Sequence, residues 1–241
     1  MPQHSRDAGL WKPGTPHPKN AGVWKPARKG HIRDVGLWKR FYARPPALTF
    51  LGGFLAQNTA TVTINVNIGA VDPDLVILAA CGGNSGSSRQ FTTCTVDGIS
   101  GTRVTPAMSG QNPAAVFATV VPNSGGARNV VVNVSGNMEG FGVGIWRAIA
   151  IAPTATGAVA TNASAAQSIA TSAGGLAVGV AGLIGTPTFT AGLADAGTIT
   201  DPAYGYSWTF GRALGLAGGT MSVDANGLNY PLLAAAAFSA S

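Results

Sequence analysis

The sequence divides sharply at Pro45-Pro46, and the two parts obey different physical constraints. Residues 1–46 carry ten Lys or Arg side chains against two Asp, a net charge of +8. Residues 47–241 carry five Arg, no Lys, six Asp and one Glu, which gives a net charge of −2. A basic segment with several Pro and Gly and few aliphatic residues cannot bury enough apolar surface to offset the entropy lost on ordering. We therefore predict a basic, extended arm over residues 1–46 and a folded domain over residues 47–241.

Three copies of one nine-residue peptide occupy the arm, at residues 4–12, 17–25 and 31–39. Each copy reads His, any residue, a base, Asp or Asn, Ala or Val, Gly, Leu or Val, Trp and Lys. Agreement at this many positions makes the copies a true internal repeat. Asp or Asn followed two residues later by Gly is typical of a tight turn, and the aliphatic-Trp-Lys segment after it predicts a short extended stretch.

The Trp and Lys of each copy are the candidate binding residues of the arm. Trp is a large apolar anchor, the kind of residue that dominates binding energy where a peptide enters a pocket. The copies either dock on equivalent sites of a symmetric assembly and add avidity, or stack on one another or on neighbouring chains as small hairpins. Three solvated turns are disfavoured because they leave three Trp exposed. The predicted anchors are Trp11, Lys12, Trp24, Lys25, Trp38 and Lys39.

The charge of the arm indicates an acidic partner, which by charge alone is a nucleic acid, an anionic membrane or a protein surface. Interleaved aromatic and basic residues suit nucleic acid. No recognised nucleic-acid-binding fold follows the arm, however, so we favour a protein partner. His4, His17 and His31 share the first position of the repeat and have no acidic or thiol ligand beside them, so we expect neither a metal site nor a cofactor.

Residues 47–241 show the patterns of β-strands and their turns. Alternating or continuous apolar runs of four to nine residues are separated by Gly, Asn, Asp and Ser, and Asp97-Gly98 is typical of a hairpin turn. Ser135-Gly136-Asn137 also predicts a turn. The expected strands are 61–68, 75–80, 91–96, 99–104, 116–121, 130–135, 141–149, 157–161, 176–183, 186–191, 204–210, 220–223 and 232–238.

Strands at intervals of roughly 8–12 residues with no helical pattern between them indicate a sandwich or a barrel. We predict an all-β fold, an antiparallel jelly-roll-like β-sandwich preceded by the extended arm. The Ala run near the C-terminus is compatible with a helix, but its place as the last element beside Phe238 favours a closing strand.

Cys81 and Cys94 are the two cysteines of the chain. The predicted strands that carry them flank a Gly/Ser loop, so the two side chains are expected to face each other across a hairpin. Two alternatives follow: a disulfide, which a protein working outside the cell acquires late, or two small buried thiols. Without a cluster of His, two cysteines do not make a zinc site.

The folded domain lacks the residues of a hydrolase. It contains no His, and Glu139 is its only Glu. Its Asp residues sit mostly at turns, beside Pro or Gly, where turn chemistry accounts for them. A nucleophile with a base, or a pair of placed carboxylates, is therefore not expected, and we predict that the protein is not an enzyme.

Aromatic residues in two strands are the candidate contact residues of the folded domain. Tyr204, Tyr206 and Trp208 alternate, so they share one strand face. On the inner face they form core, and on the outer face they contact a sugar ring or a neighbouring subunit. Trp146 poses the same alternatives.

No targeting segment is expected. The N-terminus has no apolar region of signal-peptide length, and no run approaches the roughly 20 apolar residues of a membrane helix. The apolar stretch 174–185 is short and interrupted by Gly, as in a buried strand. We expect synthesis in a cytoplasm and no membrane partner.

Residues 95–102 and 142–147, with the order of strands around them, resemble β-sandwich domains in virion proteins of tailed bacteriophages. The Gly-Leu/Val-Trp-Lys repeats are also similar to those of phage structural proteins. The resemblance implies a place in the virion as a capsid-decorating, neck-associated or fibre protein, made in the host cytoplasm.

Two functions follow. In the first, the arm ties the protein to major capsid, neck or tail subunits while the β-domain, as a homo-oligomer with a trimer favoured, braces neighbours. In the second, the β-domain is a fibre or tail tip that binds a host receptor or glycan. Low charge on the domain favours the first, because an exposed monomer surface normally carries more Lys and Glu.

Overall fold

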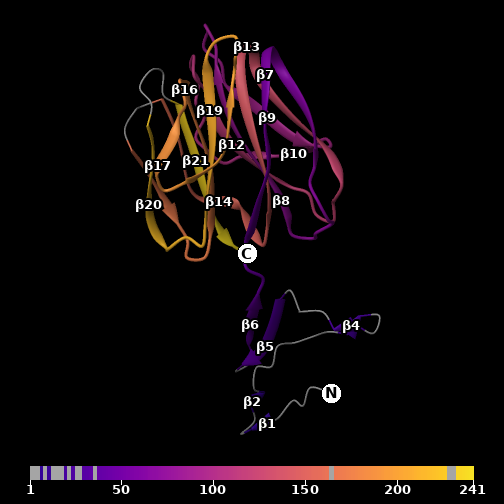
Figure 1. Cartoon of the computed structure of the whole chain (residues 1–241). Coiled ribbons are helices and arrows are strands. Elements are labelled where there is room, and N and C mark those ends of the chain that lie inside the picture. The colour runs from indigo at the N-terminus through magenta and orange to yellow at the C-terminus, as the bar shows by residue number, and fades with distance from the viewer. Residues whose placement is uncertain are drawn as a thin grey trace. The chain divides into compact units, whose positions relative to one another are not determined.

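The computed structural model is all-β, and every strand pair that it describes is antiparallel (Figure 1). It describes residues 6–7, 10–11, 19–20, 23–24, 29–34, 37–162, 166–226 and 232–241. The chain divides into two compact units, Met1–Pro45 and Pro46–Ser241, which are described separately. We call them the arm and the body.

Each repeat of the arm folds back on itself as a small antiparallel hairpin. In every copy the basic residue lies opposite the Trp, and the Asp or Asn lies opposite the Leu or Val. The pairs that share this register are Arg6 with Trp11, Lys19 with Trp24 and Arg33 with Trp38. The strands are β1 (Arg6–Asp7), β2 (Leu10–Trp11), β3 (Lys19–Asn20), β4 (Val23–Trp24), β5 (Lys29–Asp34) and β6 (Leu37–Ala43).

The first half of the body is one curved, seven-stranded sheet. Its order is β10-β9-β13-β8-β12-β11, and β7 pairs with β13 as well. Residues 99–103 pair with β9 at one end and with β12 at the other, which nearly closes the sheet into a barrel. The strands are β7 (Ala47–Asn67), β8 (Leu75–Asn84), β9 (Phe91–Val96), β10 (Ile99–Ser100), β11 (Thr102–Arg103), β12 (Ala114–Val120) and β13 (Ala127–Ile149).

Of two turns predicted in this sheet, one is confirmed and the other is wrong. Asp97 and Gly98 have φ of 47° and 81°, so the predicted hairpin turn is confirmed. The turn predicted at Ser135-Gly136-Asn137 is wrong, because β13 runs through it as one strand. The register shifts between Asn133 and Met138, so a bulge, and not a reversal, accommodates these residues.

The second half of the body adds a five-stranded sheet of order β14-β21-β16-β19-β18 and a three-stranded sheet of order β15-β20-β17. The C-terminal Ala run forms a strand, as predicted, but it lies between β14 and β16 and not at the edge of its sheet. The strands are β14 (Ile151–Thr161), β15 (Gln167–Thr171), β16 (Leu176–Ile184), β17 (Thr188–Ala191), β18 (Ala194–Thr200), β19 (Tyr206–Leu214), β20 (Gly219–Asn226) and β21 (Leu232–Ala240).

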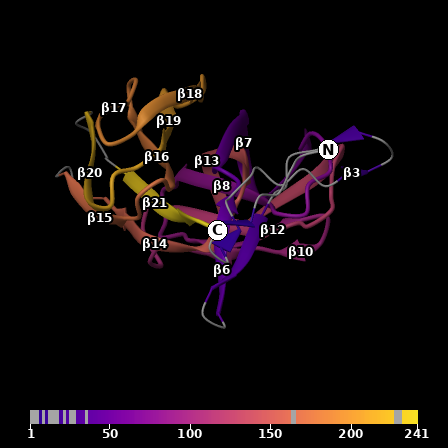
Figure 2. The ribbon, with the colours of Figure 1, turned by 90° about the horizontal axis from the view of Figure 1, so that it is seen from below.

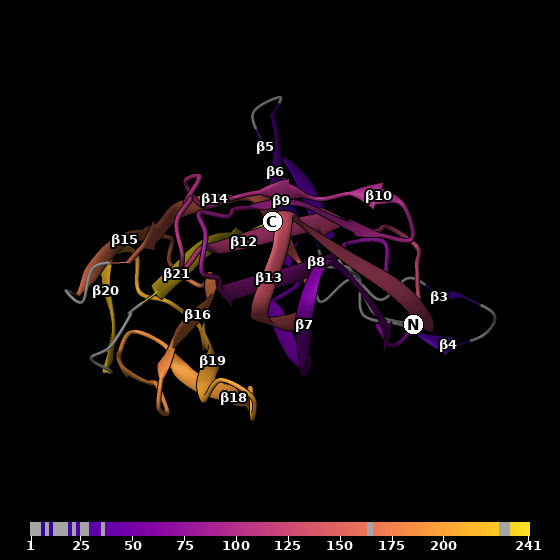
Figure 3. The ribbon, with the colours of Figure 1, turned by 90° about the horizontal axis from the view of Figure 1, so that it is seen from above.

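Three hydrophobic cores separate these layers. The barrel core fills the curved sheet, the sandwich core lies between the curved sheet and the five-stranded sheet, and the outer core lies beneath the three-stranded sheet. Across the sandwich core β7 contacts β18, β13 contacts β19, β8 contacts β16 and β12 contacts β21. Figure 2 shows β15, β17 and β20 on the side of β16 and β21 away from β8 and β13, and Figure 3 shows the same layers from above. The body is an antiparallel β-sandwich of the predicted jelly-roll type.

β8 shows how the sequence builds two of these cores at once. All ten of its residues are buried. Leu75 and Ile77 face the barrel core, whereas Val76 and Leu78 face the sandwich core. A continuous apolar run is therefore the expected pattern for this strand.

Bare glycine backbone lets large rings of one sheet rest on the other. A Cβ added at Gly144 of β13 would fall on the ring of Phe210 in β19. We expect Gly144→Ala to lower the free energy of unfolding by about 1–3 kcal/mol through overpacking. Denaturant titration measures this. Gly218→Ala is the matched control, because its nearest neighbours lie at 3.3 Å or more, and an equal loss in both variants would contradict the packing argument.

Candidate functional site

The predicted anchors of the arm recur at equivalent hairpin positions. Trp11, Trp24 and Trp38 each lie opposite a base, one pair further from the turn than the Asp or Asn of the copy. Lys39 follows in β6, opposite Ile32. Lys12 and Lys25 lie outside the described residues, as do His4 and His17. The arm thus offers one backbone arrangement three times.

Cys81 and Cys94 are free, buried thiols, which is the second of the two alternatives. The predicted hairpin between them is wrong, because β13 lies between β8 and β9. Cys81 is opposite Val143 of β13 and Cys94 is opposite Val132. Both side chains belong to the barrel core.

Burial makes both thiols poor nucleophiles. It raises the pKa of Cys81 well above its ordinary value, and nearby Cys94 raises it further. Burial raises the pKa of Cys94 to about 12, against a smaller lowering effect of the Thr119 hydroxyl. Neither thiol has the lowered pKa of a reactive cysteine.

The three alternating aromatic residues do not form one surface platform. Trp208 is 1% exposed and packs in the sandwich core, where Gly82, Gly142 and Gly182 leave room for its ring. Tyr206 is half-buried beside it, with ring centroids 6.5 Å apart. Tyr204 precedes the strand and is 44% exposed. Of the three side chains, Tyr204 offers the most surface for contact.

Trp146 and Arg147 belong to the interior and to the sheet end respectively. The Trp146 ring is fully buried, 5.2 Å from the centroid of the Phe50 ring. The Arg147 guanidinium donates hydrogen bonds of 2.8 Å and 2.7 Å to the carbonyl oxygens of Ile68 and Ala70. These two hydrogen bonds of Arg147 therefore join β13 to the loop after β7.

Two exposed or half-buried carboxylates of the body bond to nearby backbone and side chains. Asp97 accepts hydrogen bonds from the backbone of Asn129 and from the guanidinium of Arg128. The Asn129 bond is the main cause that lowers the pKa of Asp97, and Arg128 adds to it. Glu139 accepts bonds from Asn84 and from the backbone of Gly86. These contacts hold turns and strand ends.

Asp201 is the fully buried carboxylate of the described residues. One oxygen accepts hydrogen bonds from the Gln57 amide at 2.7 Å and the Ala203 backbone at 2.8 Å. The other oxygen has no hydrogen-bond partner and lies over the bare backbone of Gly140. Asp201 starts the turn that leads into β19, since its backbone nitrogen also donates to the carbonyl oxygen of Tyr206.

Among the residues that the structure describes, no three His, Cys, Asp or Glu side chains are grouped so as to hold a metal ion. The same residues include no helix of the length and hydropathy needed to cross a membrane.

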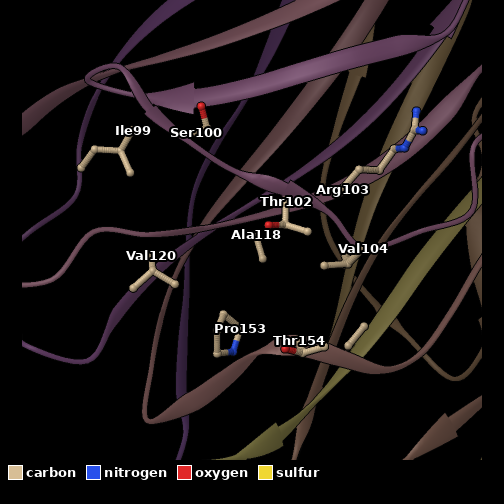
Figure 4. A pocket seen from close by; sticks show the side chains of 10 residues that line it. Ile99, Ser100, Thr102, Arg103, Val104, Ala118, Val120, Pro153 and Thr154 are labelled. Carbon is tan, nitrogen blue, oxygen red and sulfur yellow. The ribbon is translucent and has the colours of Figure 1, made fainter.

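A groove of about 480 Å³ opens on one edge of the body (Figure 4). Apolar side chains form most of its wall, with three hydroxyl groups and one Arg among them. Its lining residues are Ile99, Ser100, Thr102, Arg103, Val104, Ala118, Val120, Pro153, Thr154 and Ala155. Sequence patterns do not indicate this groove, because its two walls come from strands about fifty residues apart that belong to different sheets and meet only in the fold.

No protein-family model matches the sequence, and no curated protein matches it. Two solved structures are weakly similar to the body fold. One is an exo-beta-1,3-galactanase from Phanerochaete chrysosporium, 13% identical, with 51% of this chain and 31% of that chain covered and a TM-score of 0.21. The other is a structure of infectious bursal disease virus, Gx strain, 12% identical, with 96% of this chain and 50% of that chain covered and a TM-score of 0.29. At these scores neither likeness carries an argument about function.

The buried thiols make a direct prediction. In the native protein we expect neither Cys81 nor Cys94 to react with a thiol-specific reagent such as Ellman's reagent at pH 8, and both to react in denaturant. Absorbance of the released thiolate counts the groups. Two thiols in denaturant without added reductant fit the free pair, whereas none in denaturant until a reductant is added would show a disulfide. Rapid reaction of either thiol in the native state would contradict the burial.

Proposed function

We propose that the protein is a non-enzymatic structural protein of a bacteriophage virion. Its arm anchors it to the particle, at the capsid or the neck, and its body decorates or braces neighbouring subunits. The observation that carries this proposal is the threefold repeat, in which each copy forms a hairpin with the same base-to-Trp register.

Repetition of one binding unit favours a repeated partner. A particle built from identical subunits presents the same surface many times. A chain with three equal anchors engages such a surface with an effective concentration that a single anchor lacks. The bases of the arm add attraction to an acidic protein surface, and this attraction weakens with salt.

The charge of the body supports contact with other subunits. The domain carries no Lys at all. Among the few charges it has, Arg128 pairs with Asp97, and Arg147 and Glu139 bond to neighbouring groups. Such a surface suits packing against identical copies, so we propose a homo-oligomer, with a trimer favoured.

The first test compares binding to purified particles that lack this protein. Replacing Trp11, Trp24 and Trp38 by Ala removes the apolar anchors but keeps the charge. We expect the apparent affinity to fall on the order of 10²–10⁴-fold, the range by which linked sites exceed single ones. Co-sedimentation at low and high salt measures it.

Phe41 and Tyr42 provide the matched control, because they are arm aromatics outside the nine-residue copies. Their double Ala variant should bind as the natural chain does. A version that starts at Ala47 should not co-sediment. If that version bound particles as well as the full chain does, the arm would not be the anchor. Adhesion of the body to host cells, with no binding to particles, would favour a receptor-binding tip instead.

A further inference from the structure

The two long edges of the sandwich are closed to different degrees. At the β7 and β18 edge the sheets meet directly. A Cβ added at Gly53 would lie 2.7 Å from Cδ1 of Ile199, and one added at Gly197 would lie 2.8 Å from Cε1 of Phe50. Bare backbone on each strand therefore lets a large side chain of the other sheet seal this edge.

The opposite edge, between β10, β11 and β12 on one side and β14 on the other, holds the groove. Val104 and Ala155 line the groove and also pack against the sandwich core. Ile99 and Val120 are 44% and 43% exposed, high values for large aliphatic side chains. The sandwich core thus extends to the surface here and lacks an apolar cover.

The residues that line the groove favour an inserted side chain over an added β-strand. Pro153 of β14 has no N–H to pair with an added strand, and the β14 register shifts between Ile151 and Ala155. Insertion of a side chain is therefore favoured over addition of a strand. The Arg103 guanidinium donates to the carbonyl oxygen of Phe91 at 3.0 Å and points away from Pro153 and Thr154 (Figure 4). A large apolar side chain beside hydroxyl groups fits this wall.

We propose that this groove receives the aliphatic-Trp segment of an arm repeat from a second copy of the chain. The inference rests on the proposed function, in which the Trp of each repeat is an anchor. The arm carries +8 and the body as a whole −2, which favours association of the two parts. The groove lining itself contains one charged residue, Arg103, whose guanidinium points away from Pro153 and Thr154 (Figure 4). The groove also lies near the arm's point of exit. Ala47 is opposite Ile149 of β13, and Val120 is opposite Val76, at the same end of the curved sheet.

The number of Trp repeats per chain exceeds the number of grooves per chain, and this favours binding to a second copy of the chain. Each chain has three Trp repeats of equal register, and each body contributes one copy of this groove. A chain's own groove accommodates one of its repeats at most. The remaining repeats then have equivalent sites on neighbouring chains, which links the copies into a network.

A photo-crosslinking residue at Val120 tests this proposal. The full chain carrying p-benzoylphenylalanine at that position is mixed with ¹⁵N-labelled chain, irradiated and digested. We expect crosslinked peptides from the Trp repeats at residues 4–12, 17–25 or 31–39, joining unlabelled to labelled chains. Replacing the three arm Trp by Ala in the labelled partner should lower their yield at least about tenfold.

Ile184 is the matched control, because it is a 42% exposed aliphatic residue outside the groove. The crosslinker at Ile184 should give no arm peptide. Ile99, in β10 on the same side of the groove, serves as a second groove position if the Val120 variant is not folded. Crosslinks only within one chain, only to body peptides, or none at both groove positions would overturn the proposal. Particle binding that still depends on the three Trp would then leave the anchor function intact.

Discussion

Burial of sheets on both faces is the constraint on which the rest of this structure depends. β8 lies between the barrel core and the sandwich core, and β16 and β21 lie between the sandwich core and the outer core. A strand in such a position has no solvent face, so each residue must be apolar or small. The Ala run of β21 meets this demand, since Ala234 and Ala236 face one core and Ala235 and Ala237 the other.

Large side chains fit between stacked sheets only where the neighbouring strands have glycine, which leaves room for a ring. The Trp208 ring occupies the space over Gly82, Gly142 and Gly182, which come from three different strands. The abundance of Gly in the body is in this way matched to a few large rings. The central strands β8, β12 and β21 are buried on both faces, so they offer almost no surface for charges, which agrees with the absence of Lys after residue 46.

Local patterns in the sequence predict the fold class and most strands. β9 has the predicted bounds, and the hairpin turn after it is set by Asp97 and Gly98 alone. The strands β15 and β18 escape prediction because each contains a single large apolar residue, Ile169 and Ile199, so no apolar alternation marks them in the sequence. The turn predicted within β13 fails because the strand pairs with β7 both before and after Ser135-Gly136-Asn137, so these three residues form a bulge and the chain does not reverse.

The candidate sites also differ in whether local sequence patterns reveal them. Repetition makes the arm anchors visible in the sequence, because the Trp of each copy pairs with a base of the same copy. The groove and the separation of Cys81 from Cys94 depend on which strands become neighbours. β13 separates the two cysteines by lying between β8 and β9, and the groove forms where β12 meets β14 of the other sheet. Strand order of this kind arises from contacts between residues distant in sequence, which local patterns do not encode.

The short hairpins of the first two copies suggest a physical reason for the repetition of the arm peptide. Among the described residues of the first two copies, β1 with β2 and β3 with β4 comprise two residue pairs each. An isolated two-stranded hairpin is marginally stable at best in water. Much of the cost of ordering a copy therefore falls on its docking, which lowers the affinity of each copy for its site. Linking three copies restores the affinity without any larger interface, provided that the partner surface repeats as the arm does.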